Sequence, residues 1–282
     1  MPETAEQEQR FTDRLVEAVG ARGPLCGGID PSAALLRRWG LEDSPEGLRQ
    51  AAHAALEGFA ETTAAVKVQV AFFERHGPAG FTVLAELLEA ARERSVLLIA
   101  DAKRGDISTT AAAYAEAWLA PGAPFAADAV TVTAYLGLAA LEPMLEVAEA
   151  AGRGCFVVVS SSNPEGRGLQ EARQGLTTVE GQLLADLGTR NRAEGSLGSF
   201  GAVVGATRRF PAAELNALAG PLLVPGLGAQ GATVADVAAN FAGVEVPILV
   251  STSRALLDHG PDPRDLALAA SELSRELSSA LR

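Results

Sequence analysis

Two aspartates and a lysine share one short polar stretch, Asp101-Ala-Lys103-Arg-Gly-Asp106, which directly follows the apolar run VLLIA. In extended backbone, residues two apart point to the same side, so the side chains of Asp101 and Lys103 are expected to share a face. An ammonium group held beside carboxylates stays protonated. It is then a poor Schiff-base nucleophile, but it stabilises a developing carbanion and donates a proton to it. A solvated ion pair at a strand end is the alternative interpretation.

The chain has only two lysines among its 23 basic residues, and the other one, Lys67, lies within the apolar run AVKVQV. Because arginine supplies nearly all the cations of this chain, a remaining lysine indicates a position where arginine would not perform the same function. Lysine can give up a proton, whereas arginine in a protein effectively cannot. An unpaired buried charge is costly, so we expect Lys67 to reach a polar site. A lysine on an edge strand that extends to solvent is the alternative.

A glycine-rich turn and an arginine follow the last two apolar runs. The turn contains Gly226, Gly228 and Gln230, and Arg254 follows the run at 247–251. Glycines let backbone amides approach an anion closely, and arginine grips a phosphate with two hydrogen bonds. In barrels, the loops after strands seven and eight commonly form the phosphate site. We therefore expect this pair of loops to bind a phosphate group.

An aspartate also follows the first apolar run. Asp30 precedes Pro31, which is the usual arrangement of a helix N-cap followed by proline at the first helical position. The same aspartate also stands where a strand end meets an active site. Both interpretations stay open for Asp30 at this point.

The elements that position these residues follow from hydrophobic patterning. Eight short apolar runs occur at 25–29, 65–70, 95–100, 129–133, 155–160, 201–206, 221–225 and 247–251. Runs that are apolar throughout are typical of parallel strands buried on both faces. Helical spacing occurs between or after them at 46–62, 81–93, 137–151, 177–193 and 264–281. This alternation predicts one α/β domain over residues 1–282, a (β/α)8 TIM barrel with an extra helix within residues 1–22. A doubly wound open sheet is the alternative.

Barrel active sites form at the carboxyl ends of the strands, so the polar residues just past each run map the expected site. The segment 160–175 after the fifth run is long, polar and glycine-containing. Such a segment is typical of an active-site lid.

Composition disfavours several classes of function. The net charge of −12 disfavours nucleic-acid binding and a polybasic membrane anchor. Two isolated cysteines, Cys26 and Cys155, indicate reduced buried thiols and a cytoplasmic protein. Three histidines without ligand spacing give no support for a metal site.

Several motifs together resemble one family, the orotidine 5′-phosphate decarboxylases, in their longer bacterial branch. The resemblance covers residues 10–260, and the D-x-K-x-x-D pattern is specific to a small superfamily. The matching stretches are DAKRGDI (101–107), AVKVQVAFFERHG (65–77), PLCGGIDPS (24–32), SSSNPEG (160–166), PGLGAQGAT (225–233) and STSRALL (251–257). The resemblance implies a (β/α)8 homodimer that converts orotidine 5′-monophosphate to uridine 5′-monophosphate and carbon dioxide. This is the last step of de novo UMP synthesis, and it uses neither metal nor organic cofactor.

The resemblance also implies catalytic roles for four residues. Lys103 matches the lysine that protonates C6 of the pyrimidine, and Asp101 matches the carboxylate beside the substrate carboxylate. Lys67 and Asp106 complete an alternating array of charges, with Asp106 supplied by the partner subunit.

Substrate-binding roles are implied in the same way. Asp30, Lys67 and Thr110 match groups that hold ribose hydroxyls, Thr110 again across the dimer. Ser162 matches the serine that binds the base, with Ser161 one residue away. Gln230 and Arg254 match the phosphate grip. The sequence differs from shorter family members at Ser253, where they have glycine. The resemblance therefore does not identify which backbone amide binds the phosphate.

Three other functions compete with this expectation. A related sugar-phosphate decarboxylase of the 3-keto-gulonate phosphate type shares the motif but needs acidic metal ligands, and Lys67 stands where a carboxylate would be wanted. A Schiff-base aldolase on the same barrel is the second. A non-catalytic phosphoribosyl-binding protein is the third, and it has no need for opposed charges around two lysines.

Overall fold

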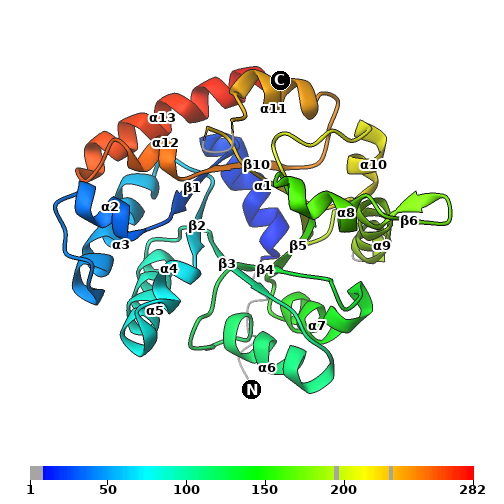
Figure 1. Cartoon of the computed structure of the whole chain (residues 1–282), viewed down its shortest axis with the longest axis horizontal. Coiled ribbons are helices and arrows are strands. Elements are labelled where there is room, and N and C mark those ends of the chain that lie inside the picture. The colour runs from blue at the N-terminus through cyan, green and yellow to red at the C-terminus, as the bar shows by residue number, and fades with distance from the viewer. Residues whose placement is uncertain (1–8, 194–196, 229–230) are drawn as a thin grey trace, which may run out of the picture.

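Eight parallel strands form a closed barrel in the computed structural model, which describes residues 9–193, 197–228 and 231–282. The strand order around the barrel is β1-β10-β9-β8-β5-β4-β3-β2. The strands are β1 (Leu25–Ile29), β2 (Ala65–Gln69), β3 (Leu98–Arg104), β4 (Ala129–Val132), β5 (Gly154–Ser160), β8 (Phe200–Val204), β9 (Leu222–Pro225) and β10 (Ile248–Thr252). Helices surround these strands (Figure 1). The predicted (β/α)8 barrel is confirmed.

Closure of the sheet decides between the two predicted architectures. The first strand pairs with the last, with Leu25 opposite Val250, so the open-sheet alternative is wrong. Each predicted apolar run coincides with one barrel strand to within a few residues. The largest difference is in β3, which runs on through Arg104 because its pairing with β4 shifts register between Ala100 and Arg104. This bulge lies in the motif that carries Asp101.

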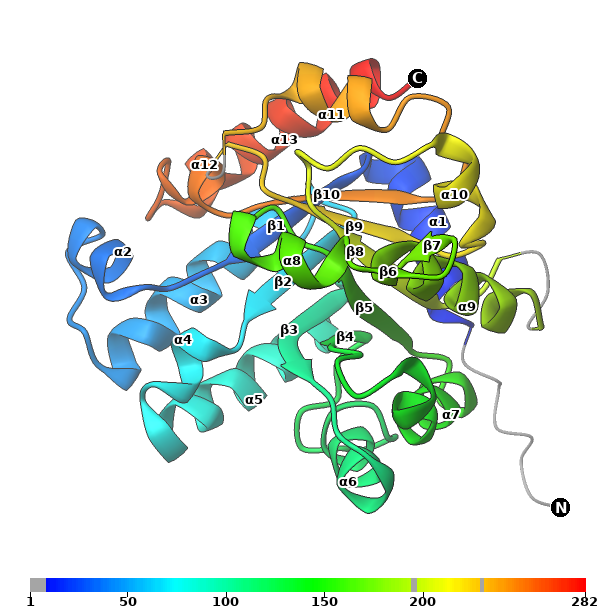
Figure 2. The same cartoon turned by 45° about the vertical axis from the view of Figure 1, so that its right-hand side comes forward.

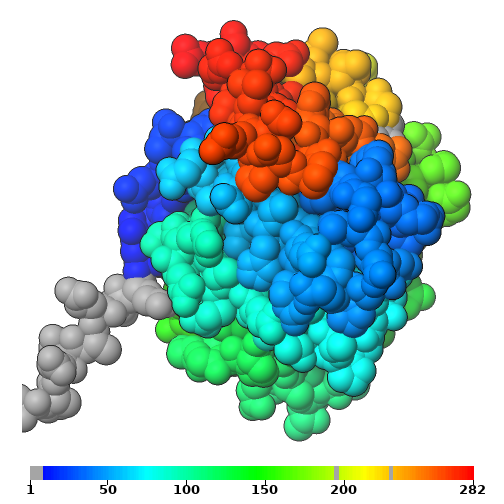
Figure 3. Space-filling model, turned by 90° about the vertical axis from the view of Figure 1, so that its left-hand side faces the viewer, coloured from blue at the N-terminus to red at the C-terminus, as the bar shows by residue number. Residues whose placement is uncertain are grey.

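The outer layer contains a helix in every segment with predicted helical spacing. Its helices are α2 (Ala33–Arg38), α3 (Pro45–Phe59), α4 (Ala71–Glu74), α5 (Gly77–Glu93), α6 (Ser108–Trp118), α7 (Glu142–Ala150), α9 (Val179–Ala193), α10 (Ala212–Ala217), α11 (Val234–Asn240), α12 (Arg254–Leu257) and α13 (Pro263–Ala280), with a 3-10 turn η1 (Leu138–Leu141). Helix α13 packs on α3, and α3 packs on α5. Figure 3 shows these segments as a continuous surface from orange through blue to cyan. Within the described part of the chain, no helix is long and apolar enough to cross a membrane.

The amino end of the barrel is covered by α1 (Phe11–Arg22), which lies behind the strands in Figure 2. The predicted extra helix is thus present, and residues 1–8 lie outside the described residues. Phe11 and Leu15 are fully buried in a cluster with Phe156 of β5. The rings of Phe11 and Phe156 meet edge to face at 5.9 Å. A Cβ at Gly154 would lie 2.4 Å from the Phe11 ring, so the glycine allows this approach.

Replacing Phe11 by alanine should therefore destabilise the protein strongly. Loss of a fully buried phenylalanine costs about 3–5 kcal/mol through lost burial and the cavity left behind. The free energy of unfolding, measured in urea, should fall by that amount. Val16→Ala is the matched control, because Val16 lies on the same helix with 47% of its surface exposed. Equal effects of the two substitutions would contradict this role for α1.

The expected lid after β5 has structure of its own. It contains a 3-10 turn η2 (Pro164–Gly166), helix α8 (Arg167–Gln170) and a hairpin of β6 (Arg173–Gln174) and β7 (Thr177–Thr178). In Figure 2 this segment, hereafter the β5–α9 segment, lies in front of the barrel strands. It is therefore placed over the carboxyl ends of the strands, where the site is expected.

Candidate active site

A cavity of about 630 Å³ opens at the carboxyl ends of the barrel strands. Six of the nine predicted site residues line it: Asp30, Lys67, Asp101, Lys103, Ser162 and Arg254. They come from the carboxyl ends of five strands, since Asp101 and Lys103 both lie on β3, and only closure of the barrel brings these ends together. Gln230 lies outside the described residues. Asp106 and Thr110 do not line this cavity.

Asp101 is the centre of a charged array. Lys67 Nζ donates to Asp101 Oδ2 at 3.0 Å, and Lys103 Nζ donates to Asp101 Oδ1 at 2.5 Å. Thr131 Oγ1 and Gln69 Nε2 also donate to this carboxylate, at 2.8 and 3.1 Å. Only 11% of the Asp101 side chain is exposed. The alternative interpretation of Asp101 and Lys103 as a solvated ion pair is therefore wrong, because the Asp101 carboxylate is largely buried.

Lys67 is buried within the barrel on β2, which has a neighbouring strand on each side. The edge-strand alternative is wrong for this reason. Burial alone would lower the pKa of Lys67, but the charges of Asp101 and Asp30 outweigh it and raise that pKa well above its usual range. Lys67 is thus a fixed cation.

The carboxylate between the two ammonium groups is equally fixed in its charge. Burial alone would raise the pKa of Asp101. The charges of Lys67 and Lys103, together with their hydrogen bonds, lower it well below its usual range instead. Asp101 therefore presents a full negative charge to anything bound in the cavity at neutral pH.

Lys103 reaches Asp101 by a route that strand alternation does not describe. Its φ is +48°, in the left-handed region, and it lies within the bulge of β3. Its backbone N–H donates to Thr131 Oγ1 at 3.0 Å, and half of its side chain is exposed to the cavity. The predicted convergence of Asp101 and Lys103 is confirmed, but regular extended backbone is the wrong reason for it.

In the described part of the chain, one buried carboxylate oxygen of Asp30 accepts no hydrogen bond. Its Oδ1 has no partner among the described residues. The N-cap of α2 is Ser32, whose side chain accepts from Leu35 N at 3.2 Å, so the N-cap interpretation of Asp30 is wrong. Buried polar atoms normally have partners. The carboxylate is thus available to a hydroxyl group in the cavity.

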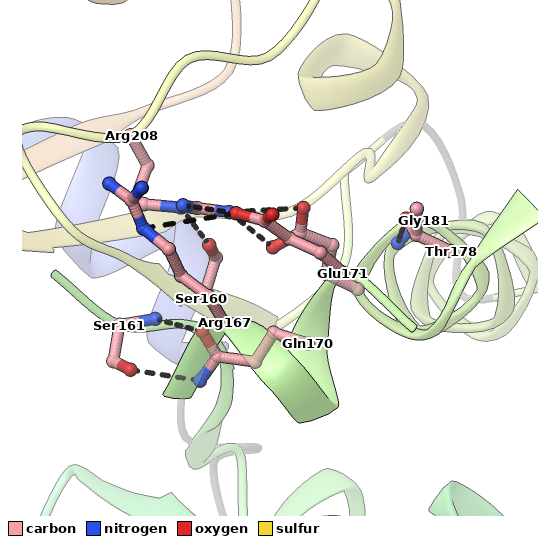
Figure 4. A network of polar contacts seen from close by, with 9 residues as sticks. Ser160, Ser161, Arg167, Gln170, Glu171, Thr178, Gly181 and Arg208 are labelled. Carbon is pink, nitrogen blue, oxygen red and sulfur yellow. Dashed lines mark hydrogen bonds and ion pairs between the residues drawn. The ribbon is translucent and has the colours of Figure 1, made fainter. Parts of the chain in front are cut away.

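The two serines at the start of the β5–α9 segment both line the cavity. Gln170 of α8 binds Ser161 twice, because it accepts from Ser161 N at 3.1 Å and donates to Ser161 Oγ at 2.8 Å (Figure 4). The Ser161 hydroxyl is therefore engaged by the segment itself. Both serines line the cavity, so the expected role of Ser162 toward the base stays a prediction.

An arginine that the sequence analysis did not single out holds the β5–α9 segment on the barrel. Arg208 Nε donates to Ser160 Oγ at 2.7 Å, and its other nitrogens bind Glu171 at 2.8 Å and Glu180 at 3.0 Å. The arginine side chain is only 11% exposed. Figure 4 shows Arg208 between Ser160 and Glu171. One signal was available, since Arg208 follows the apolar run at 201–206 in the position of a site residue.

The part of the cavity that follows β9 and β10 contains a positively charged side chain and closely packed backbone. Arg254 at the start of α12 is exposed and has no ion-pair partner among the residues that the structure describes. Gly226 and Gly228 both have positive φ, which glycine adopts without strain. A Cβ at Gly28 would lie 1.9 Å from Ser253 Oγ, so this glycine lets the β10–α12 turn approach the cavity. The arrangement suits a phosphate group.

Asp106 and Thr110 form no part of the lining of the cavity in their own chain. Asp106 Oδ1 accepts from Ile107 N at 2.7 Å, and Thr110 is exposed in the first turn of α6. Across residues 9–193, 197–228 and 231–282, no group of three or more His, Cys, Asp or Glu side chains could hold a metal ion.

The fold and the cavity define a (β/α)8-barrel enzyme with a small-molecule site built around a Lys–Asp–Lys array. The chain belongs to the orotidine 5′-phosphate decarboxylase / HUMPS family, whose model matches residues 23–269. This match covers every barrel strand.

Comparison with individual proteins shows which enzyme of this family the chain is similar to. The orotidine 5′-phosphate decarboxylase of Corynebacterium efficiens is 45% identical over 275 residues, which cover 95% of this chain and 97% of that protein. The protein of the same name from Streptomyces coelicolor is 44% identical, with 96% and 98% covered. A crystal structure from Streptomyces avermitilis, provisionally assigned to the same enzyme, has a TM-score of 0.94 at 43% identity and covers 100% and 99%.

Proposed function

We infer that this protein decarboxylates orotidine 5′-monophosphate to uridine 5′-monophosphate and carbon dioxide, in pyrimidine biosynthesis. The observation that carries this inference is the array in which Asp101 lies between the ammonium groups of Lys67 and Lys103 inside the cavity. The relatives with this name cover nearly the whole chain. The related sugar-phosphate decarboxylase is not favoured, because Lys67 fills the place of a metal-binding carboxylate.

The charges suit the loss of carbon dioxide from C6 of the pyrimidine. Departure of carbon dioxide leaves an electron pair on C6 that the ring delocalises poorly, so stabilisation must come from the enzyme in the transition state. The Lys103 ammonium stabilises that pair and then transfers a proton to C6. Asp101, whose charge is fixed by two cations, lies beside the departing carboxylate. Lys67 holds Asp101 in place.

The remaining lining residues suit the other parts of the nucleotide. The unpartnered oxygen of Asp30 accepts from a ribose hydroxyl, with Lys67 beside it. Ser162 binds the base, and Arg254 binds the phosphate together with Gln230. No metal or organic cofactor takes part in this proposal, because the proton, the charges and the phosphate grip all come from side chains.

A homodimer with shared sites is part of the proposal. Asp106 and Thr110 lie outside the cavity of their own chain, and each would complete the cavity of the partner. Ile107, Tyr135 and Leu136 in the adjoining β3–α6 and β4–η1 loops are large apolar side chains with 54%, 79% and 56% exposure. A second subunit would bury them. We also propose a cytoplasmic location, consistent with two free buried cysteines.

The function is tested by a substrate panel on the purified protein. Orotidine 5′-monophosphate should lose its absorbance with EDTA present, while 3-keto-gulonate 6-phosphate should not release carbon dioxide even with magnesium. Borohydride with substrate should leave the protein active, since no Schiff base forms. Turnover of the sugar phosphate alone would move the chain to the related decarboxylases, and trapping by borohydride would favour an aldolase.

Arg254→Ala should mainly weaken the use of the phosphate. A charge-assisted hydrogen bond contributes about 1.5–3 kcal/mol, so kcat/KM for the nucleotide should fall roughly 10- to 200-fold. With orotidine, which lacks the phosphate, kcat/KM of the Arg254→Ala variant should be nearly the same as kcat/KM of the wild-type protein. Arg264→Ala on the exposed start of α13 is the control. An equal loss with both substrates would show that Arg254 is structural and that the phosphate lies elsewhere.

A further inference from the structure

The catalytic lysine of the proposed reaction has a backbone conformation that its own side chain disfavours. Lys103 has a φ of +48°, and it lies where the pairing of β3 with β4 shifts register. A residue with a Cβ rarely stays in the left-handed region unless its surroundings fix it there. Something in the structure must therefore hold the turn formed by residues 102–104.

The next residue, Arg104, makes the contacts that hold this turn. Arg104 Nη1 donates to the carbonyl oxygen of Ala102 at 2.8 Å, which spans Lys103 directly. Its Nη2 forms an ion pair with Glu74 at the end of α4. The backbone oxygen of Arg104 accepts from Thr133 N at 2.8 Å. Both sides of Lys103 are thus tied to fixed groups.

The same guanidinium also rests on α6. Its central carbon lies 5.8 Å from the ring centre of Tyr114 and 5.5 Å from that of Trp118. The Trp118 ring in turn stacks on Phe125 at 5.0 Å, and only 21% of the Arg104 side chain is exposed. Arg104 therefore connects the turn to two helices, and it does not enter the cavity itself.

We propose that Arg104 is a positioning residue, which aims the ammonium group of Lys103 at Asp101 by fixing the turn at residues 102–104. This inference rests on the proposed function. The planar guanidinium binds Ala102 and Glu74 with separate nitrogens while its face lies against aromatic rings. A lysine at this position has one nitrogen and no planar face, so it cannot make the same set of contacts. A positive charge at position 104 is therefore not sufficient to fix the turn at residues 102–104.

The kinetic test compares Arg104→Lys and Arg104→Met with wild type. A misplacement of about 1 Å can cost about 100-fold in rate, so kcat should fall 10- to 100-fold in both variants. KM and the Kd of the product nucleotide should change less than about threefold, because the binding groups are untouched. Arg49→Lys, in an exposed ion pair on α3, is the matched control and should retain wild-type kcat. A kcat within twofold of wild type, or an equal loss of kcat and product binding, would overturn the proposal.

A structural readout separates this proposal from the proposed function. In a crystal structure of Arg104→Met, or of Arg104→Lys if the first variant does not fold, Lys103 should leave the left-handed region and its Nζ should lose the 2.5 Å contact with Asp101. An unchanged Lys103 would overturn the positioning role whatever the activity. An inactive wild-type protein would instead reject the proposed function, and the structure of the variant would still decide the role of Arg104.

Discussion

Lys103→Arg is expected to lower kcat by about 10²- to 10⁴-fold, the range supplied by a positioned proton donor. The positive charge is kept, but the guanidinium does not release its proton, and its wider planar fork does not fit at 2.5 Å from Asp101 Oδ1. Binding of the product nucleotide should change much less, because the phosphate and ribose contacts remain. Steady-state kinetics and calorimetric titration with UMP measure the two quantities.

Lys103→Ala is the control for this prediction. It should be as slow as Lys103→Arg if the proton matters more than the charge, and slower still if the charge also stabilises the carbanion. A Lys103→Arg enzyme with wild-type kcat would show that the proton reaches C6 from another group.

Mixing two inactive homodimers should restore activity. In a heterodimer of Lys103→Ala and Asp106→Ala chains, one site combines both defects. The other has an intact Asp101 and Lys103 from one chain and an intact Asp106 from its partner. Twofold symmetry then gives about one working site per heterodimer, or about half of the wild-type activity per dimer. The measurement is turnover after subunit exchange, with exchange itself followed by native mass spectrometry of differently tagged chains.

Two controls define the outcome. Each parent incubated alone must stay inactive, and a mixture of Lys103→Ala with Asp101→Ala should also stay inactive, since both residues belong to the same chain's site. If exchange is complete and the first mixture remains at the level of its parents, Asp106 acts within its own chain and the shared site is wrong.

The barrel was predictable because its determinants are local. A strand buried on both faces needs a continuous apolar run, and such runs are visible without knowledge of the fold. Lys67 was predictable for a related reason, because a single charge within an apolar run has few acceptable locations. Its actual partner, Asp101, lies 34 residues away and is brought next to it by the neighbouring strand.

What the sequence did not reveal depends on tertiary contacts. No sequence pattern marks Lys103 as left-handed, and its backbone N–H is bound by Thr131, which lies 28 residues away on β4. Arg208 binds Glu180 of α9, which lies 28 residues earlier in the chain. The hydrogen bond from Gln170 to Ser161, nine residues earlier in the chain, was likewise not predicted.

Decarboxylation in D2O, followed by NMR with EDTA present, tests the central claim most directly. Loss of carbon dioxide from C6 and transfer of an exchangeable proton from Lys103 should convert orotidine 5′-monophosphate to UMP that carries deuterium at C6, with one carbon dioxide released per UMP. The Lys103→Ala enzyme should form no UMP on the same timescale. The account would be contradicted if the wild-type protein formed no UMP, if turnover required an added metal ion, or if Lys103→Ala formed the C6-deuterated product at the wild-type rate.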